Sequence, residues 1–329
     1  MNINLCFVTD DGYSMPTCVT ITSILMNKNK TTNYNIYILC SNVNEKNKMK
    51  FMELNQEKFN IYLIDLENKF AADDYKIPGI PATPTSIYKF FIPDILKNID
   101  KVIYLDGDII VTSDLSELYT YELNDKILAA VKDTNGLNNK SSIYNKYKYF
   151  NSGLLLMNLK KMRSDNISSK LFDYRKNGFN KLMDQDTFNF VLKDKTLLLP
   201  FKYNVQMNTL SSEIMKYENY NMYNFKKYWV IDENCKNIFD IMKNATILHY
   251  TTAKPWKFYD GYGNDIWFKY YLCSPYKSEE LFRESYYIRK IINSKSYKLT
   301  KKITKIGIFK KKKNKKYIQF LNNFIDKKR

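Results

Sequence analysis

The sequence is poor in the residues that build cross-linked, fibrous or linker-rich proteins. Its 329 residues include five cysteines, nine glycines and eight prolines. The cysteines are odd in number, lie far apart and contain no Cys-x-x-Cys pair, which argues against a disulfide framework or a zinc knuckle and indicates a reducing compartment. An apolar content of 44% over this length suffices for one large core or two smaller ones.

Long apolar runs are absent as well. Nowhere do about 18 consecutive apolar residues occur, the length that a membrane-spanning helix needs. The N-terminus enters a strand-like run at once, without the basic and apolar segments of a signal peptide. We therefore expect a protein that is neither secreted nor membrane-spanning.

Charge is distributed unevenly along the chain. The formal net charge is +18, but residues 293–329 hold 13 lysines and Arg329 against a single acidic residue, Asp326, so this tail carries +13. A nucleic-acid binder should spread its basic residues over the folded domain. We therefore expect no nucleic-acid partner, and instead a domain of residues 1–270 followed by a helical, strongly basic region, 271–329.

Short apolar runs of strand type alternate with segments of helical periodicity. In the first half, strands are expected at residues 3–8, 34–40, 60–64 and 101–105, and helices near 15–27, 44–58 and 85–97. In the second half, strands are expected at 127–131, 153–157 and up to His249, and helices near 159–176 and 184–193. The alternation predicts an α/β fold with a mainly parallel sheet flanked by helices, which binds nucleotides at the carboxyl ends of its strands.

Two carboxylates stand two residues apart at the end of one strand-like run, Lys101-Val102-Ile103-Tyr104-Leu105-Asp106-Gly107-Asp108. Because side chains alternate along an extended segment, Asp106 and Asp108 can project to one side, while Gly107 lets a diphosphate approach the backbone. Carboxylate oxygens suit Mg²⁺ or Mn²⁺, which can bridge nucleotide phosphates. Alone the motif is weak, since Asp184-Gln185-Asp186 has the same form within a predicted helix.

The single histidine, His249, ends a second apolar run and is followed by Lys254 and Pro255-Trp256. A lone histidine there is more often structural than a ligand, but the lysine five residues on offers a point charge for phosphate. Two carboxylates, one imidazole and one ammonium make a diphosphate site. Because imidazole nitrogen favours Mn²⁺ over Mg²⁺, we predict a Mn²⁺ site of Asp106, Asp108 and His249, with Mg²⁺ as the alternative ion.

These motifs belong to a longer ordered set. Its blocks are Phe7-Val8-Thr9-Asp10-Asp11-Gly12-Tyr13, Ser86-Ile87-Tyr88-Lys89, Tyr104-Leu105-Asp106-Gly107-Asp108, Phe150-Asn151-Ser152-Gly153-Leu154-Leu155-Leu156-Met157-Asn158-Leu159, Asp184-Gln185-Asp186, and His249 through Trp256. Over residues 1 to about 270 their order and spacing resemble family 8 glycosyltransferases. These retaining, metal-dependent enzymes use nucleotide sugars and include lipopolysaccharide glucosyl- and galactosyltransferases and glycogenin.

Three positions depart from the family pattern. The family commonly has arginine where Lys89 stands, and asparagine is frequent where Gly12 stands. The segment from His249 to Lys254 is one residue shorter than usual and lacks a glycine. The last departure bears on how far Lys254 reaches toward the phosphates, and leaves the histidine unaffected.

The resemblance implies a GT-A type domain in which the metal holds the diphosphate of UDP-glucose or UDP-galactose. It implies that Asp10, with the backbone of Val8 and Gly12, faces the uracil or ribose, and that Asp106 serves both ribose and metal. It places Lys89 near the donor phosphate or sugar. The residue chemistry leaves another interpretation open for each: Asp10 as a turn or helix cap, and Lys89 as an exposed helix lysine.

Four more residues fall where the family binds sugar hydroxyls: Asp133, Asn151, Asp184 and Gln185. Their alternatives are a turn for Asn151 and a helix start for Asp184 and Gln185. Retention needs either a carboxylate nucleophile with two inversions or same-face attack steered by the leaving phosphate. The sequence does not decide between them, and we favour same-face attack.

The basic tail gives a separate expectation. From Tyr317 onward, apolar residues follow an i, i+1, i+4, i+7, i+8 pattern, which makes one apolar helical face flanked by lysines. Such a segment suits an anionic membrane surface, and its alternatives are a solvated charge run and nucleic-acid binding. We expect a cytoplasmic enzyme, peripherally attached to the inner face of the membrane, that glycosylates a lipopolysaccharide-type or other lipid-linked glycan.

Two other functions stay open. A self-glycosylating enzyme of the glycogenin kind would need a tyrosine acceptor on a partner subunit, and the chain has 28 tyrosines. A non-catalytic sugar-binding protein would have lost part of the metal and phosphate set, which is complete here. The oligomeric state and the choice of donor sugar are beyond the sequence, because one epimeric hydroxyl is distinguished by the placement of pocket groups.

Overall fold

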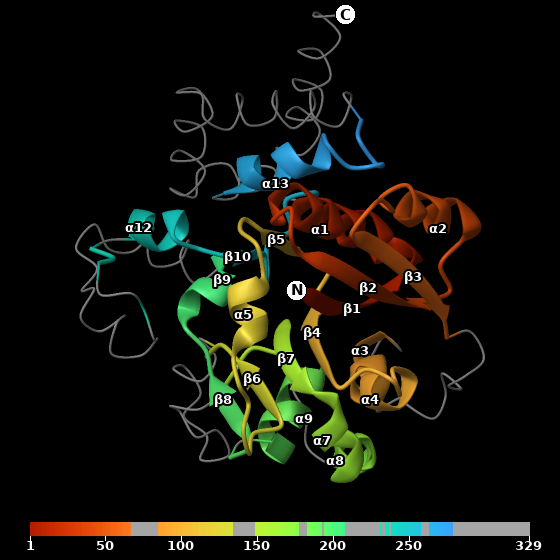
Figure 1. Ribbon diagram of the computed structural model, residues 1–329, viewed down its shortest axis with the longest axis vertical. Coiled ribbons are helices and arrows are strands. Elements are labelled where there is room, and N and C mark those ends of the chain that lie inside the picture. Colours follow the sequence, from red (N-terminus) through yellow and green to blue (C-terminus); the bar gives the residue numbers. More distant parts are fainter. Residues whose placement is uncertain are drawn as a thin grey trace, which may run out of the picture. The chain divides into compact units, whose positions relative to one another are not determined.

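A seven-stranded sheet forms the centre of the fold (Figure 1). The computed structural model describes residues 1–66, 85–133, 149–177, 183–192, 194–207, 231, 234–236, 238–257 and 263–278. The sheet has the order β3-β2-β1-β4-β7-β6-β8, and a second sheet has the order β5-β10-β9. The strands are β1 (Asn2–Asp10), β2 (Asn33–Ser41), β3 (Phe59–Asp65), β4 (Lys101–Leu105), β5 (Ile109–Val111), β6 (Leu128–Ala130), β7 (Leu154–Asn158), β8 (Thr196–Leu198), β9 (Val205–Gln206) and β10 (Ile247–His249).

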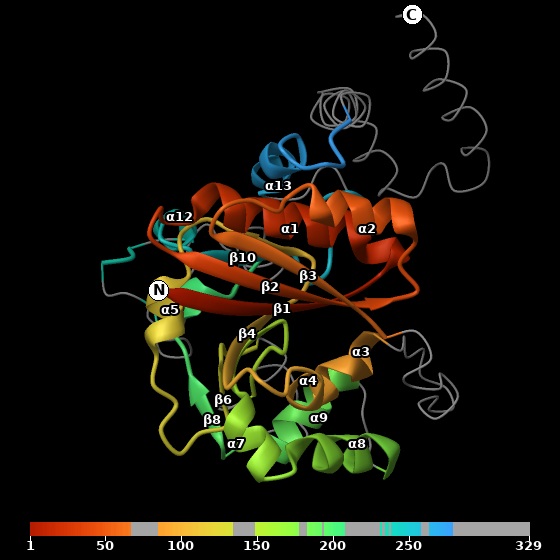
Figure 2. The same ribbon diagram turned by 45° about the vertical axis from the view of Figure 1, so that its right-hand side comes forward.

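Helices cover both faces of the large sheet, which gives three layers (Figures 1 and 2). The helices and 3₁₀ turns are η1 (Asp11–Tyr13), α1 (Ser14–Asn27), α2 (Glu45–Met52), α3 (Thr85–Tyr88), η3 (Lys89–Phe91), α4 (Ile92–Ile95), α5 (Ser116–Thr120), α7 (Leu159–Ser164), α8 (Ile167–Asn177), α9 (Met183–Leu192), η4 (Phe201–Tyr203), α12 (Ile238–Lys243) and α13 (Asn264–Tyr271). Helices α1 and α2 lie on one face, with α13 packed on α1, whereas α3, α4, α7, α8 and α9 gather on the other.

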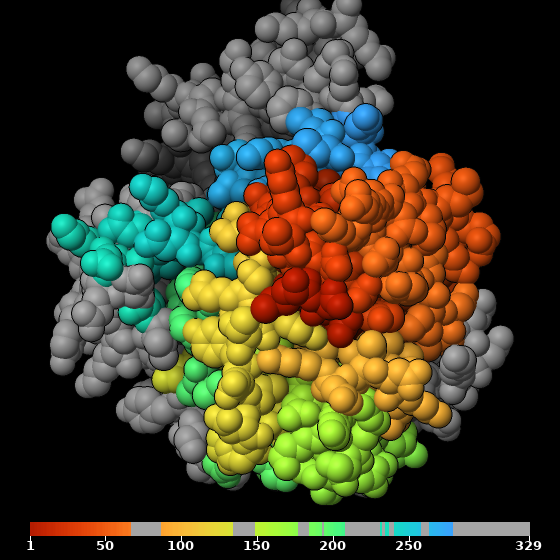
Figure 3. Space-filling view, viewed as in Figure 1, coloured from red at the N-terminus to blue at the C-terminus, as the bar shows by residue number. Residues whose placement is uncertain are grey.

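The central strand shows why this sheet needs two covering layers. Val102, Ile103, Tyr104 and Leu105 of β4 are all buried, as expected for a strand with helices on both faces. β4 pairs in parallel with β1 and antiparallel with β7. In the space-filling view, β1–β3 and their helices (red to orange) adjoin the segment from β4 to α5 (yellow) (Figure 3).

The predicted α/β fold with a mainly parallel sheet is confirmed, with one strand reversed. β7 runs antiparallel to both its neighbours, β4 and β6. Its residues Leu154–Asn158 are apolar nearly throughout, and an apolar run has the same pattern in either direction. The strand was therefore placed correctly while its direction was not specified.

Three predicted helices are shorter or broken, for local reasons. The helix expected near 44–58 ends at Met52. The one expected near 85–97 becomes α3, η3 and α4, since Pro93 at the start of α4 has no N–H for a continuous helix. The one expected near 159–176 splits between α7 and α8, where Asn166 adopts a left-handed φ of 51° that ends a helix.

The chain divides into two compact units. The first comprises Met1–Lys257 and Gly261–Lys277, and the second comprises Phe258–Asp260 and Ser278–Arg329. The predicted amphipathic tail at residues 293–329 lies outside the described residues, and the expected boundary at residue 270 stays a prediction. In the described part of the chain, no helix has both the length and the apolar character needed to cross a bilayer.

Candidate active site

Strand ends from both sheets meet at one place and carry polar side chains. Asp106 directly follows β4, and Asp108 directly precedes β5. β10 pairs antiparallel with β5 and sets His249 opposite Ile109, so the imidazole lies beside Asp108. The backbone N–H of Tyr250 donates to the carbonyl of Asp108 (3.0 Å), which fixes the two segments to each other.

The three residues predicted as metal ligands form a close cluster. One ligand atom from each of Asp106, Asp108 and His249 lies within 4.8 Å of the others. His249 Nε2 is 3.2 Å from Asp108 Oδ1 and 3.9 Å from Asp106 Oδ2. A nitrogen and several carboxylate oxygens facing one point are a donor set for Mn²⁺. Metal binding itself stays a prediction.

The charge state of Asp108 suits that role. Its carboxylate is buried, which alone would raise the pKa, but the neighbouring His249 and Lys254 outweigh burial and hold the pKa well below its usual range. Asp108 Oδ1 is buried and accepts no hydrogen bond within the described residues. Lys254 bonds the other oxygen, Oδ2, and leaves Oδ1 without a donor in the described part of the chain. A buried charged oxygen without a partner is costly, and a divalent ion bound to Oδ1 would supply one, so the residues fit such an ion.

Lys254 lies at this cluster. Its ammonium donates to Asp108 Oδ2 and to the carbonyl of Tyr250 (2.7 Å), four residues earlier. With the shortened segment after His249, the lysine thus reaches the carboxylate of a predicted metal ligand. The predicted contact of Lys254 with a donor phosphate stays a prediction.

Lys89 is buried, so its interpretation as an exposed helix lysine is wrong. Its ammonium lies between Asp106 Oδ1 (3.0 Å) and Asp184 Oδ2 (2.8 Å) and over the ring of Tyr104 (4.7 Å). Burial alone would lower the pKa of Lys89, but the two carboxylates outweigh it and raise the pKa above its usual value. The lysine therefore joins the predicted metal ligand Asp106 to the predicted sugar-binding residue Asp184.

The four predicted sugar-binding residues are buried and linked. Asn151 Nδ2 donates to Asp133 Oδ2 (2.9 Å) and to Gln185 Oε1 (3.1 Å). Gln185 and Asp184 lie in the first turn of α9, where Asp184 accepts a hydrogen bond from Ser152 Oγ (2.8 Å). The structure therefore brings Asp133, Asn151, Asp184 and Gln185 together, and their contact with sugar stays a prediction.

The predicted nucleotide residues of the first strand lie at its carboxyl end. Val8 is in β1, and Gly12 is in the turn η1 that follows. Asp10 Oδ1 accepts the backbone N–H of Tyr13 (2.9 Å), so this carboxylate does cap the turn, as its alternative interpretation held. The capping bond occupies Oδ1, and the predicted contact of Asp10 with uracil or ribose stays a prediction.

Two glycines of the site are required by packing. A Cβ on Gly107 would collide with Thr17 of α1, so its missing side chain lets α1 approach the turn that carries Asp106 and Asp108. A Cβ on Gly153 would collide with His249 Cε1 and come within 2.8 Å of Asp106 Oδ2. Gly153 therefore makes room for two of the predicted ligands.

Several other residues take part in this network although no role was predicted for them. Tyr104 donates its hydroxyl to Asp106 Oδ1 (2.8 Å), and Asn204 bonds His249 Nδ1 (2.9 Å). Tyr149 receives a bond from Gln185 Nε2 (3.2 Å). Asn204 and Tyr149 lie outside the motif blocks, and Tyr104 lies in one without a predicted role of its own, so only the fold reveals their places.

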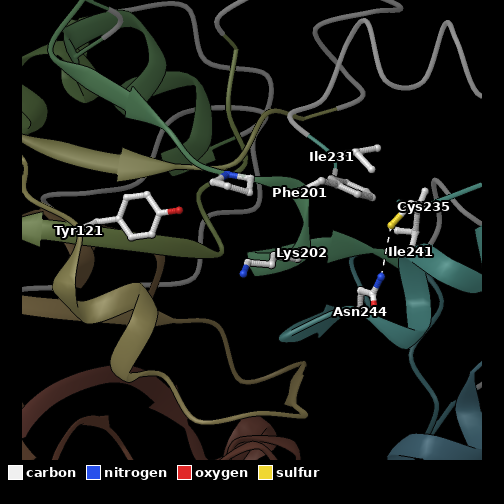
Figure 4. A pocket seen from close by; sticks show the side chains of 8 residues that line it. Tyr121, Phe201, Lys202, Ile231, Cys235, Ile241 and Asn244 are labelled. Atoms are coloured by element: carbon white, nitrogen blue, oxygen red, sulfur yellow. Dashed lines mark hydrogen bonds between the residues drawn. The ribbon is translucent and has the colours of Figure 1, made fainter. Parts of the chain in front are cut away.

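A pocket of about 450 Å³ lies elsewhere on the chain (Figure 4). It is lined by Tyr121, Pro200, Phe201, Lys202, Ile231, Cys235, Ile241 and Asn244. Its lysine, Lys202, is bonded to Glu117 (2.8 Å), and Asn244 donates to Cys235. None of the predicted site residues lines this pocket, so its presence does not change the placement of the site at the strand ends.

Residues 4–260 match the family model of glycosyl transferase family 8. The chain belongs to this family. As predicted from the ordered motifs, the family 8 protein is a hexosyltransferase. The match covers the described site from Val8 to Lys254.

Among curated relatives, the family 8 protein is 29% identical to the lipopolysaccharide 1,2-glucosyltransferase of Escherichia coli K12 over 294 residues, which cover 84% of this chain and 80% of the relative. It is also 30% identical to a putative glycosyltransferase of Haemophilus influenzae, over 61% of this chain and 63% of the relative. The similarity to the first relative thus extends over most of both chains.

Solved structures confirm the GT-A fold of the family 8 protein. The bifunctional glycosyltransferase WbbM, in its apo form, has a TM-score of 0.70 at 22% identity and covers 86% of this chain and 51% of its own. The galactosyltransferase LgtC, in complex with donor and acceptor sugar analogues, has a TM-score of 0.66 at 23% identity and covers 86% of this chain and 100% of its own.

Proposed function

We propose that this protein is a retaining, Mn²⁺-dependent glycosyltransferase that moves glucose or galactose from a UDP-sugar to a lipopolysaccharide-type or other cell-surface glycan. The observation that carries the proposal is the cluster of Asp106, Asp108 and His249 at the strand ends of a family 8 fold. Nucleotides bind at this edge of α/β sheets. The curated relative named for transfer of glucose to lipopolysaccharide supports the acceptor class.

Different side chains would bind different parts of the donor. Asp106, Asp108 and His249 would hold the Mn²⁺, which supplies positive charge to the departing diphosphate. Lys254, which already lies at Asp108, adds a second cation for the same phosphates. Asp133, Asn151, Asp184 and Gln185 offer carboxylate and amide groups to the sugar hydroxyls.

The hydrogen bonds of Asp184 and Gln185 favour same-face attack over a carboxylate nucleophile. Asp184 is bonded to Lys89 Nζ and Ser152 Oγ, both at 2.8 Å, and a carboxylate held in this way is a weaker nucleophile. Gln185 is an amide whose Oε1 already accepts the backbone N–H of Ser152 (3.2 Å). We therefore propose that the leaving diphosphate steers the acceptor to the same face of the sugar.

The donor is identified by a screen of UDP-sugars. With Mn²⁺ present, we expect UDP release from UDP-glucose or UDP-galactose and much less from UDP-sugars with an N-acetyl group, and we expect EDTA to stop it. A coupled assay measures the release of UDP. The intact mass of the enzyme, measured in parallel, should stay unchanged if the enzyme does not glycosylate itself. Full activity in EDTA would contradict the metal role, and a mass increase by hexose units would favour a glycogenin-like function.

For location we propose a cytoplasmic enzyme attached to the inner face of the membrane through residues 293–329, whose +13 charge supports the proposal. Deleting this tail should leave UDP-sugar hydrolysis nearly intact and greatly reduce sedimentation with anionic vesicles. Each basic residue near such a surface contributes about 1 kcal/mol, so added salt should release the full chain. Sedimentation at several salt concentrations measures both effects.

Two variants of the full chain separate charge from the apolar face. Replacing Lys310, Lys311, Lys312 and Lys313 by glutamine should weaken binding to anionic vesicles, whereas Leu321→Ser with Phe324→Ser should weaken binding even at low salt. If the shortened protein pelleted as well as the full chain, the anchor would be elsewhere. A tail that bound RNA and vesicles equally well at physiological salt would also contradict the proposal.

A further inference from the structure

A chain of side-chain amides connects the predicted sugar-binding residues to the predicted metal ligand His249. Asn151 Nδ2 donates to Asp133 Oδ2 (2.9 Å), and Asn204 Nδ2 donates to Asn151 Oδ1 (2.9 Å). Asn204 Oδ1 in turn lies 2.9 Å from His249 Nδ1. Asn204 is fully buried, and the other members are 6% exposed or less. Burial keeps these groups from bulk water, so each member depends on its partners.

The donors and acceptors along this chain of hydrogen bonds can be assigned in one way. The backbone N–H of Gly153 can only donate, and it donates to Asn151 Oδ1 (3.0 Å). The amide NH₂ of Asn151 therefore faces the Asp133 carboxylate. Asn204 must present its own NH₂ to Asn151 Oδ1, because two amide oxygens cannot bond each other. Its Oδ1 is then left for the histidine.

The orientation of Asn204 determines where His249 carries its proton. An amide oxygen only accepts, so His249 Nδ1 must be the protonated nitrogen. In the neutral ring, Nε2 then has the free lone pair, and it lies 3.2 Å from Asp108 Oδ1. A nitrogen lone pair this close to a buried carboxylate oxygen is unfavourable without a cation to which both can bind. This is the form of the ring that binds a metal through Nε2.

We propose that Asn204 is a positioning residue, which fixes His249 in the Nδ1–H tautomer through Asn151 and Asp133 and so keeps Nε2 available for a metal. The inference rests on the proposed metal role of His249. It gives Asn151 a second function besides sugar binding, because the amide that faces the sugar site also orients the amide that holds the ligand.

A side chain at position 204 must both accept and donate to complete the chain. Its position is set by the 3₁₀ turn η4, in which the backbone N–H of Asn204 donates to Phe201 (3.0 Å), and by β9, which pairs in parallel with β10. Leucine has a similar volume and neither donates nor accepts. Aspartate accepts from His249 Nδ1 but cannot donate to Asn151. The two substitutions therefore separate the two halves of the role.

The single histidine makes a direct test feasible. In metal-free enzyme with ¹⁵N-labelled histidine, at a pH at which imidazole is neutral, long-range ¹H–¹⁵N NMR distinguishes the two ring nitrogens. We expect the Nδ1–H tautomer in the wild type and in Asn204→Asp, and a mixture or the Nε2–H tautomer in Asn204→Leu. Losing such an outer partner typically costs about ten- to a hundredfold in metal affinity, which Mn²⁺ titration by EPR measures. Asn204→Asp should lose less.

A matched control is Asn27→Leu, which removes an amide that donates to Tyr270 and the carbonyl of Val111, away from His249. It should lower the melting temperature without changing the tautomer. An Nε2–H tautomer in the wild type would overturn the proposal, and this needs no variant to fold. An unchanged tautomer in Asn204→Leu would do the same. If the tautomers are as expected but wild-type enzyme binds no Mn²⁺, the positioning of His249 by Asn204 is supported and the proposed metal role is wrong.

Discussion

Replacing His249 by alanine or Asp108 by asparagine is expected to reduce hexose transfer by at least about a thousandfold. Each change removes a ligand of the predicted Mn²⁺ site, and losing one group that stabilises developing charge costs about a hundred- to a thousandfold even when the rest of a site survives. Asp108→Asn also leaves Lys254 without its carboxylate partner. Rates of UDP release at saturating UDP-sugar, with Mn²⁺ varied, measure the loss.

The control is a carboxylate with structural partners only. Asp114 accepts from Tyr34 Oη (2.9 Å) and the backbone N–H of Asn29 (2.8 Å), so Asp114→Asn should lower the melting temperature and leave the Mn²⁺ dependence as it is. A near wild-type rate of His249→Ala would show that the metal assignment is wrong. So would an Asp108→Asn variant whose rate responded to high Mn²⁺ in the same way as the rate of the wild type.

The sequence predicted that Asp106, Asp108 and His249 would lie together better than it predicted their surroundings, and the reason is spacing. Asp106 and Asp108 lie on one turn, and His249 ends an apolar run, so strand ends alone brought them to one edge. Lys89 is different, because its partners Asp106 and Asp184 lie 17 and 95 residues away. Its ion pair with Asp184 depends on how α9 packs, which no local pattern encodes.

Asn204 shows more clearly what could not be predicted from the sequence. It follows Phe201-Lys202-Tyr203, a sequence without catalytic signature, and its importance comes from two bonds to Asn151 and His249, 53 and 45 residues away. The breaks in the predicted helices were easier to predict than the contacts of Asn204. Pro93 marks a place where a helical N–H is missing, whereas the left-handed turn at Asn166 is one of several conformations that asparagine allows.

Gly153→Ala is expected to reduce activity by about a hundredfold or more. The backbone of Gly153 accepts the N–H of Asp106 (2.8 Å), so the residue cannot move away from β4. A Cβ there would collide with His249 Cε1, and it would lie 2.8 Å from Asp106 Oδ2 and 3.0 Å from Asn151 Oδ1. The ring and the carboxylate must shift, and a misplacement of about 1 Å costs about a hundredfold in rate. Overpacking should also lower stability by about 1–3 kcal/mol.

Gly12→Ala is the matched glycine control, because among the described residues a Cβ at Gly12 would meet only Asp10 Oδ1, at an ordinary 3.5 Å. We expect it to keep its Mn²⁺ affinity and its melting temperature. Mn²⁺ affinity separates the two effects on Gly153→Ala: a displaced His249 weakens Mn²⁺ binding, whereas a general loss of stability lowers the melting temperature alone. A Gly153→Ala enzyme with wild-type rate and Mn²⁺ affinity would mean that the imidazole has room to move without loss, and that the tight fit around His249 does not position it.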